Sequence, residues 1–286
     1  LVARAEARID PFDRGFLFGD GLYEGLRAFD GTIYGLSLHE SRLRGALAEC
    51  RIDFDAGALG PLSRDLLAAN GLRDAFVYWQ ITRGAPAPDA QSKDLRKRIP
   101  GREIARPTVF GYCVPLPGVN ECVAPKVVRA STVRDTRWTR CHVKSVSLMG
   151  NVLHAIEAAE AGEDDAIMVR DGFATEASST NLFVVKDGRI ATPPVDKGFN
   201  LRGVTREKLL RVVPGIEVRE VAERELRDAD EILLAGTITM VAAVTRLDGR
   251  PVGDGGAGPA ARTLYDALVA DIRAECAARP NYTPVA

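Results

Sequence analysis

The pattern of apolar and polar residues alternates along the chain between the two-residue period of strands and the longer period of helices. Leu43, Ala46 and Leu47 recur at helical spacing, so they predict one buried stripe of a helix. Ser37 can cap this helix, because Glu40 stands three residues later and completes a capping box. The pattern therefore predicts an amphipathic helix that begins near Ser37.

Strand-like runs outnumber helix-like runs in the second half of the chain. We predict strands near residues 32–36, 75–82, 108–114, 126–130, 166–170, 182–186, 189–192, 232–235 and 241–247. We predict further helices near residues 59–70, 148–161, 205–213 and 260–277. Asp-Gly pairs at 30–31, 171–172 and 187–188 indicate tight turns between neighbouring strands. The fold class is therefore expected to be α+β.

A segment rich in Pro and Gly, residues 114–120, predicts a break in the chain between two domains. We expect a small N-terminal α/β domain at 1–115, a linker at 116–122 and a larger α+β domain at 123–286. The polar, basic stretch 85–106 is long for a loop inside a compact domain, and such loops are often functional.

Composition and charge narrow the class of protein. With 46% hydrophobic and 27% charged residues the chain is typical of a globular protein, and its net charge of -1 argues against nucleic-acid binding. Its 5 cysteines and 3 histidines show no metal-ligand spacing, so we expect reduced thiols and no metal. No apolar run approaches the ~20 residues of a membrane span and no signal peptide is visible. We therefore expect a cytoplasmic protein without a membrane partner.

Lys144 differs from the other lysines in its neighbourhood. It lies in a stretch where apolar residues alternate, with arginines just upstream and Ser145 or Ser147 as the expected start of a helix. Burial and nearby positive charge both lower the pKa of a lysine and free its amine as a nucleophile. Taken alone, however, a lysine is most often a solvated surface charge.

Two other segments carry weaker signals. Residues 13–25 contain four glycines, which indicate turns or a close approach of the backbone, although a purely structural hairpin explains them equally well. Glu176 precedes a predicted strand and stands close to Ser179 and Thr180, whose hydroxyl groups can line a pocket. A hairpin with a solvent-facing Glu176 is the alternative interpretation.

A predicted helix opens just after Gly203, with Thr205 in its first turn. The N-terminus of a helix binds phosphate through its N–H groups and its dipole. The loop 235–239 follows a buried strand and can supply further N–H groups to an anion. The motif is short, so it predicts a phosphate site only together with other features.

Taken together, these segments resemble the class IV, or fold-type IV, pyridoxal-phosphate enzymes. The matching segments, in the family's order, are DRGFLFGDGLYEG at 13–25, RLRGALAECRI at 42–52, KSVSLMGNVL at 144–153, TEASSTNLFVV at 175–185 and LRGVTR at 201–206. Each is weak alone, and their common order carries the resemblance. It implies a two-domain fold in which the larger domain holds a barrel-like sheet.

The resemblance implies a role for each matching residue. Lys144 would form a Schiff base with pyridoxal phosphate and shuttle the proton during catalysis. Glu176 would keep the pyridinium nitrogen protonated, Arg51 would pair with the phosphate, and Leu201 would pack on the ring. The other cofactor-binding residues that it implies are Val204, Thr205, Thr237, Ile238 and Arg137.

The lysine segment resembles D-amino-acid transaminases most closely. Those enzymes follow a strand similar to 77–84 with an Arg-x-His pair that grips the substrate carboxylate, and this chain lacks the pair. Arg27 and, in the long loop, Arg96 and Arg98 are the candidates for that role. A surface charge cluster is the alternative interpretation of 93–98. The other expected substrate-binding residues are Tyr23, Ser179 and Thr180.

The resemblance thus implies a transaminase that moves an amino group from a D-amino acid, such as D-alanine or D-glutamate, to a 2-oxo acid such as 2-oxoglutarate by a ping-pong route. The alternatives on the same fold are a branched-chain L-amino-acid transaminase, an (R)-amine transaminase and an aminodeoxychorismate lyase. A catalytically silent ligand-binding protein is a more remote alternative. The resemblance also implies a homodimer.

Overall fold

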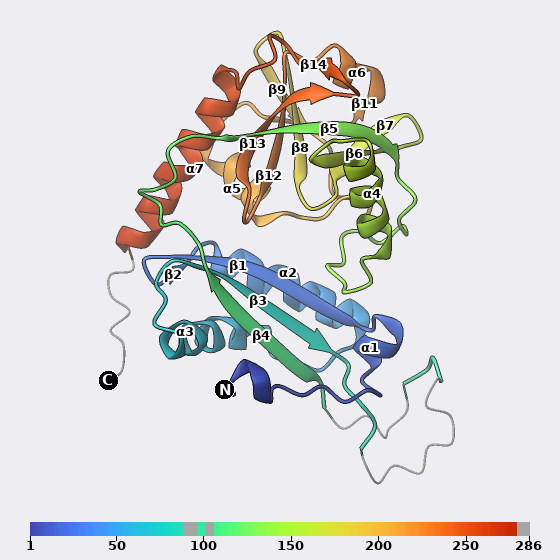
Figure 1. Cartoon of the computed structure of the whole chain (residues 1–286), viewed down its shortest axis with the longest axis vertical. Coiled ribbons are helices and arrows are strands. Elements are labelled where there is room, and N and C mark those ends of the chain that lie inside the picture. The colour runs from blue at the N-terminus through green and yellow to red at the C-terminus, as the bar shows by residue number, and fades with distance from the viewer. Residues whose placement is uncertain (88–96, 101–105, 279–286) are drawn as a thin grey trace. The chain divides into compact units, whose positions relative to one another are not determined.

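The computed structural model describes residues 1–87, 97–100 and 106–278 (Figure 1). These residues form two compact units. The first unit comprises Leu1–Leu116 and Val143–Ser147, and the second comprises Pro117–His142 and residues 148–278. The domain boundaries expected from the sequence stay a prediction.

The first unit is built on a four-stranded antiparallel sheet in the order β2-β1-β3-β4. Its elements are η1 (Arg4–Glu6), α1 (Arg14–Phe18), β1 (Gly21–Phe29), β2 (Thr32–Ile33), α2 (Leu36–Cys50), η2 (Ala56–Ala58), α3 (Leu59–Ala69), β3 (Ala75–Thr82) and β4 (Thr108–Pro115). Figure 1 shows α2 and α3 alongside the strands of this unit.

The two faces of this sheet differ because side chains alternate along each strand. Leu22 and Leu26 of β1 and Val77 of β3 are buried in one core with Leu43 of α2 and Leu67 of α3. This core face is therefore the one that the helices cover. The opposite face carries aromatic side chains, which belong to the candidate site.

The second unit contains ten strands and four helices among its described residues. Its elements are β5 (Lys126–Arg134), α4 (Met149–Glu160), β6 (Asp165–Arg170), β7 (Phe173–Ala177), β8 (Asn181–Lys186), β9 (Arg189–Thr192), α5 (Val204–Val212), β10 (Glu217–Val218), β11 (Val221–Ala222), α6 (Glu223–Arg227), β12 (Glu231–Gly236), β13 (Met240–Leu247), β14 (Arg250–Pro251) and α7 (Pro259–Ala278).

Six of these strands pair into a closed ring in the order β5-β6-β7-β8-β12-β13, because β13 pairs with β5 and β7 pairs with β8. The β7–β8 junction is a single residue pair, Glu176 opposite Asn181. Leu182, Ile232 and Val244 are among the apolar residues of this unit's core. The predicted barrel-like sheet is therefore present, and Glu176 lies at the strand pair that closes it.

The Asp-Gly turns are confirmed. Both residues have positive φ at 30–31 (48° and 77°), at 171–172 (51° and 80°) and at 187–188 (49° and 73°), as two-residue hairpin turns require. The α+β fold class is also confirmed.

The predicted capping residues of two helices are wrong. Helix α2 begins at Leu36, and its N-cap is Gly35 at a φ of 65°, so Ser37 lies inside the helix and does not cap it. The strand expected at 32–36 ends at Ile33 for the same reason. Helix α4 spans Met149–Glu160, close to the predicted 148–161, but its N-cap is Leu148, so neither Ser145 nor Ser147 caps it.

Candidate functional site

Lys144 lies in the short segment Val143–Ser147, which joins the first unit and runs beside the start of β1. The Tyr23 N–H donates to the Lys144 carbonyl over 3.0 Å, and the Val146 N–H donates to the Gly21 carbonyl over 3.0 Å. These bonds fix the backbone on both sides of the lysine. The Lys144 amine lies 4.2 Å from the centroid of the Tyr23 ring, so two residues predicted for the site are brought together.

Tyr23 begins a row of tyrosines that crosses the sheet on the face opposite the helices. The Tyr23 and Tyr78 ring centroids are 5.7 Å apart, and the Tyr78 and Tyr112 centroids are 5.2 Å apart. Burial raises the pKa of Tyr78 to about 12, with Tyr23 and Tyr112 adding to the shift. The Tyr78 hydroxyl therefore stays protonated near neutral pH, and it donates to Gln80 Oε1 over 3.0 Å.

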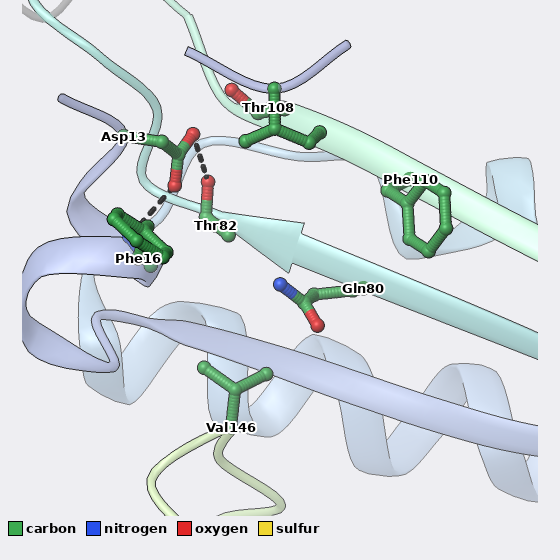
Figure 2. A pocket seen from close by; sticks show the side chains of 9 residues that line it. Asp13, Phe16, Gln80, Thr82, Thr108, Phe110 and Val146 are labelled. Carbon is green, nitrogen blue, oxygen red and sulfur yellow. Dashed lines mark hydrogen bonds between the residues drawn. The ribbon is translucent and has the colours of Figure 1, made fainter. Parts of the chain in front are cut away.

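A pocket of about 450 Å³ lies in the first unit, between α1 and strands β3 and β4 (Figure 2). Val146, two residues after Lys144, lines it together with Gln80, which is the register partner of Tyr23. The buried carboxylate of Asp13 accepts a hydrogen bond of 2.8 Å from the Thr82 hydroxyl at the pocket wall. One residue that lines the pocket, Val146, is thus close in sequence to the candidate lysine. Asp13 is the one charged residue among the described residues that line the pocket.

The arginines predicted to bind the substrate carboxylate differ in burial and in location. Arg27 is buried on the same face of β1 as Tyr23, and its guanidinium carbon lies 4.5 Å from the centroid of the Phe29 ring. Arg98 is exposed, and its carbonyl accepts a hydrogen bond from Arg14. Arg96 lies outside the described residues. Of the three, the structure places Arg27 on the face that carries Lys144.

Arg51, the predicted phosphate partner, is exposed at the C-terminal end of α2. It has a φ of 55°, in the left-handed region, and its carbonyl accepts a hydrogen bond of 2.7 Å from Arg83. A left-handed residue of this kind is common where a helix ends and the chain changes direction. The structure thus places Arg51 at the surface of the first unit.

The sequence analysis missed a buried charge cluster formed by Glu24, His39 and Arg42. The Arg42 guanidinium donates to both Glu24 oxygens over 2.9 and 2.6 Å, and His39 Nδ1 lies 2.7 Å from Glu24 Oε2. Burial acts to raise the pKa of Glu24, but Arg42 and His39 outweigh it and lower that pKa to about 2. Burial, with Arg42 and Lys144 nearby, lowers the pKa of His39.

A signal for this cluster was present in the sequence. Successive side chains of a strand point to opposite faces of the sheet, so Glu24 lies on the same face of β1 as Leu22 and Leu26, which is the core face. A charged residue on a core face needs a partner of opposite charge. Arg42 stands one residue before Leu43, a member of the apolar stripe of α2.

Acid should destabilise the protein through Glu24. Its pKa falls from an ordinary value of 4.5 to about 2 in the folded state, so its stabilising contribution is complete above pH 4.5 and is lost as the pH falls towards 2. We expect a loss of about 3 kcal/mol of unfolding free energy across this range. Urea unfolding from pH 5 to 2 measures it. Asp30→Asn, at an exposed carboxylate paired with Arg73, should leave the slope unchanged, and a wild-type slope equal to that of Glu24→Gln would contradict the expectation.

Glu176, in the second unit, is buried and accepts hydrogen bonds from three donors. Arg137 Nη1 is 2.5 Å from Oε1, and the Leu201 N–H and Asn181 Nδ2 are 2.9 and 3.1 Å from Oε2. Donors of this kind favour the ionised carboxylate over the neutral acid. The structure therefore brings Glu176, Arg137 and Leu201 together, as predicted for the cofactor site, and adds Asn181.

Helix α5 begins next to this carboxylate. Gly203 is its N-cap and provides no side-chain cap, so no side chain caps the first turn, which holds Val204 and Thr205, and a helix start of this kind can accept an anion. A Cβ at Gly203 would lie 1.8 Å from Asn181 Oδ1, so only glycine allows this approach. Val204 and Thr205 are both buried.

Thr237 and Ile238 lie in the turn between β12 and β13, and this turn meets the loop of Ser179 and Thr180. A Cβ at Gly236 would lie 2.9 Å from the Thr180 side chain, which shows how close the two loops are. The Thr180 hydroxyl is buried, and among the described residues it has no hydrogen-bond partner. An unpaired buried hydroxyl of this kind is suited to a polar ligand.

Gly203→Ala should weaken cofactor binding sharply, because the new methyl group must displace Asn181, which holds Glu176. We expect the dissociation constant for pyridoxal phosphate to rise at least about tenfold. Titration of the cofactor-free protein measures this. Gly45→Ala is the matched control, since nothing lies within 4 Å of a Cβ there and alanine favours its helix. Equal affinities for the two variants would refute the packing argument.

Two classes of feature are absent from the described part of the chain. Residues 1–87, 97–100 and 106–278 hold no group of three or more His, Cys, Asp or Glu side chains placed to bind a metal ion. No helix within these ranges is long and apolar enough to cross a membrane.

Comparisons with known proteins agree with this geometry. The amino-transferase class IV family model matches residues 21–247. The D-alanine aminotransferase of Bacillus licheniformis is 36% identical over 283 residues, covering 97% of this chain and 96% of that protein. The chain therefore belongs to the class IV aminotransferases.

Solved structures support the fold. A fold IV-transaminase from Curtobacterium pusillum is 25% identical, with a TM-score of 0.79, and the similarity covers 96% of this chain and 92% of that one. The branched-chain amino acid aminotransferase of Thermoproteus uzoniensis, solved with norvaline, is 23% identical, with a TM-score of 0.80 and coverage of 96% and 94%. The predicted family, the fold-type IV architecture and the pyridoxal phosphate cofactor are thus confirmed.

Proposed function

We propose that this protein is a D-amino-acid transaminase, which moves an amino group from D-alanine or D-glutamate to 2-oxoglutarate by a ping-pong route. The observation that carries the proposal is the similarity to a D-alanine aminotransferase over nearly the whole of both chains. The lysine segment supports it, because it resembles D-amino-acid transaminases more than branched-chain enzymes.

Each unit, taken by itself, holds residues of the kind that pyridoxal phosphate needs. When bound, the cofactor supplies an electron sink for the pair left when the substrate loses its Cα proton. Lys144 is the amine that we assign to hold the cofactor and to carry that proton. Glu176 is assigned to the ring nitrogen, where its charge favours the protonated form. Leu201 is assigned to the ring face.

We assign the phosphate to backbone N–H groups at Val204, Thr205, Thr237 and Ile238. The absence of a side-chain cap at the start of α5 supports this, since a helix N-terminus favours an anion. The sequence assigned the cationic partner of the phosphate to Arg51. The exposure of Arg51 weakens that assignment, which an Arg51→Ala variant can test.

For the substrate carboxylate we propose Arg27 and Tyr23. Both lie on the face of β1 opposite the helices, where Arg27 is buried, and a guanidinium is suited to a bidentate carboxylate. Ser179 and Thr180 are assigned to the polar rim of the substrate site, on the evidence of the buried Thr180 hydroxyl. Arg96 and Arg98 stay predictions of the sequence.

A substrate panel tests the proposed function. Purified protein loaded with pyridoxal phosphate and given 2-oxoglutarate should form pyruvate from D-alanine. Product from L-leucine in place of D-alanine would favour a branched-chain enzyme, and product from (R)-phenylethylamine an amine transaminase. Pyruvate and aminobenzoate from aminodeoxychorismate would indicate a lyase. A protein that takes up cofactor but turns over none of these substrates would be a silent binder.

We also propose a homodimer. Strand β4 is the edge of its sheet, and its Val109, Phe110, Tyr112 and Val114 are each at least 36% exposed. An exposed apolar edge strand is suited to a second copy of the same surface. Mass measured in solution tests this, and a monomer at micromolar concentration would refute it. A cytoplasmic location stays a prediction of the sequence.

A further inference from the structure

Arg137 lies between two buried carboxylates in the second unit. Its Nε and Nη2 donate to the two oxygens of Asp135 over 3.0 and 2.9 Å, a bidentate pair, and its Nη1 donates to Glu176. Nη2 also donates to the Phe199 carbonyl over 3.0 Å. The guanidinium is thus fixed in its plane, with Glu176 at one edge and Asp135 at the other.

Asp135 is itself held from several sides. Its side chain is fully buried. Arg170 Nη2 lies 3.1 Å from Oδ1, and the Thr175 hydroxyl donates to Oδ2 over 3.2 Å. Burial acts to raise the pKa of Asp135, but Arg137 and Arg170 outweigh it and hold that pKa below its usual range. Asp135 is therefore an anion at neutral pH.

The four charges of this cluster balance, because Asp135 and Glu176 are matched by Arg137 and Arg170. Two further groups act on Glu176 through space. Burial raises the pKa of Cys141 to about 11, so its thiol is neutral. The Arg206 guanidinium donates hydrogen bonds to other groups, among them the Thr192 hydroxyl and the Pro193 carbonyl. Asp135 is thus the anion that directly shares Arg137 with Glu176.

We propose that Asp135 is a positioning residue that acts through Arg137, taking up the guanidinium charge so that the Glu176 carboxylate keeps its charge for the cofactor's ring nitrogen. The inference rests on the proposed function, since it takes Glu176 as the partner of that nitrogen. Without Asp135, Arg137 would have Glu176 as its remaining carboxylate partner. The cluster would gain one positive charge beside the place where the ring nitrogen carries its proton.

The test compares two ligands of the cofactor-free protein. One is pyridoxal phosphate, and the other is its carbocyclic analogue, in which a C–H group replaces the ring nitrogen. The ratio of the analogue's dissociation constant to that of pyridoxal phosphate measures what the ring nitrogen contributes. Asp135→Asn should lower this ratio about threefold to tenfold, as expected for a coupled pair in one network. If Asp135 served only to stabilise the fold, Asp135→Asn would weaken the binding of both ligands alike and leave the ratio unchanged.

Three other variants sharpen the result. Glu176→Gln should lower the ratio at least as far. Adding Asp135→Asn to Glu176→Gln should have little further effect, because both substitutions act through the charge of the Glu176 side chain. Asp164→Asn, at an exposed carboxylate paired with Arg129, is the matched control and should not change the ratio.

The double variant Asp135→Asn/Arg137→Gln covers the case in which Asp135→Asn alone does not fold. It removes both charges of the Asp135–Arg137 pair, so no uncompensated Arg137 guanidinium remains beside Glu176. It should restore the wild-type ratio. A ratio unchanged in Asp135→Asn, or still low in the folded double variant, would overturn the inference. A wild-type protein that binds neither ligand would instead overturn the proposed function, and the inference with it.

Discussion

Lys144→Ala is expected to reduce transamination by at least about 10³-fold, because we assign to this one amine both the hold on the cofactor and the transfer of the reaction's proton. The bonds of the Lys144 backbone to Tyr23 do not involve the removed amine, so the fold should survive. Turnover of D-alanine with 2-oxoglutarate measures the loss. The same protein treated with borohydride in the presence of cofactor should lack the modified peptide that wild type gives.

Lys186→Ala is the matched control for this prediction. Lys186 is an exposed lysine that pairs with Asp230 over 3.0 Å at the surface of the second unit. Its removal should leave both turnover and the borohydride-modified peptide as in wild type. A wild-type adduct that maps to any lysine other than Lys144 would contradict the assignment.

Arg42→Ala is expected to cause the largest loss of stability, about 3 to 5 kcal/mol of unfolding free energy. The change leaves Glu24, which is fully buried, without its cationic partner in the core of the first unit. Glu24 must then take up a proton or draw water into the core, and either costs free energy. Denaturant unfolding at pH 7 measures the loss. Retention of full stability would show that the cluster contributes little.

Arg51→Ala is the comparison, because Arg51 directly follows the same helix, α2, as its C-cap but is exposed. It should change the unfolding free energy by less than about 0.5 kcal/mol. If Arg51 binds the cofactor phosphate, the variant loses affinity for pyridoxal phosphate but keeps its affinity for pyridoxal, which has no phosphate. Unchanged affinity for both ligands would remove Arg51 from the site.

Features encoded within a few residues were predictable from the sequence. The Asp-Gly turns formed because Asp and Gly tolerate positive φ, and each of the three pairs took it. The Ser37 cap failed although its motif was present, because Gly35 turns the chain into the helix before Ser37 is reached. Local capping rules thus give way where the preceding hairpin fixes the path of the chain.

Features that depend on distant residues were harder to predict. The sequence pointed to Glu176 through resemblance, but its contacts to Arg137 and Leu201 depend on strand pairing and loops many residues apart. The His39 and Arg42 partners of Glu24 were missed for the same reason, since a strand and a helix must first pack together. Periodicity shows which face a residue occupies, and it does not show which residue it meets there.

The most direct test of the proposed function is a half-reaction with the two enantiomers of alanine. Cofactor-loaded protein is mixed with D-alanine or L-alanine without any 2-oxo acid, and the cofactor absorbance is followed until pyridoxamine phosphate accumulates. We predict that D-alanine converts the cofactor at least about 100-fold faster than L-alanine. Conversion by L-alanine or L-leucine at an equal or higher rate would contradict a D-amino-acid transaminase.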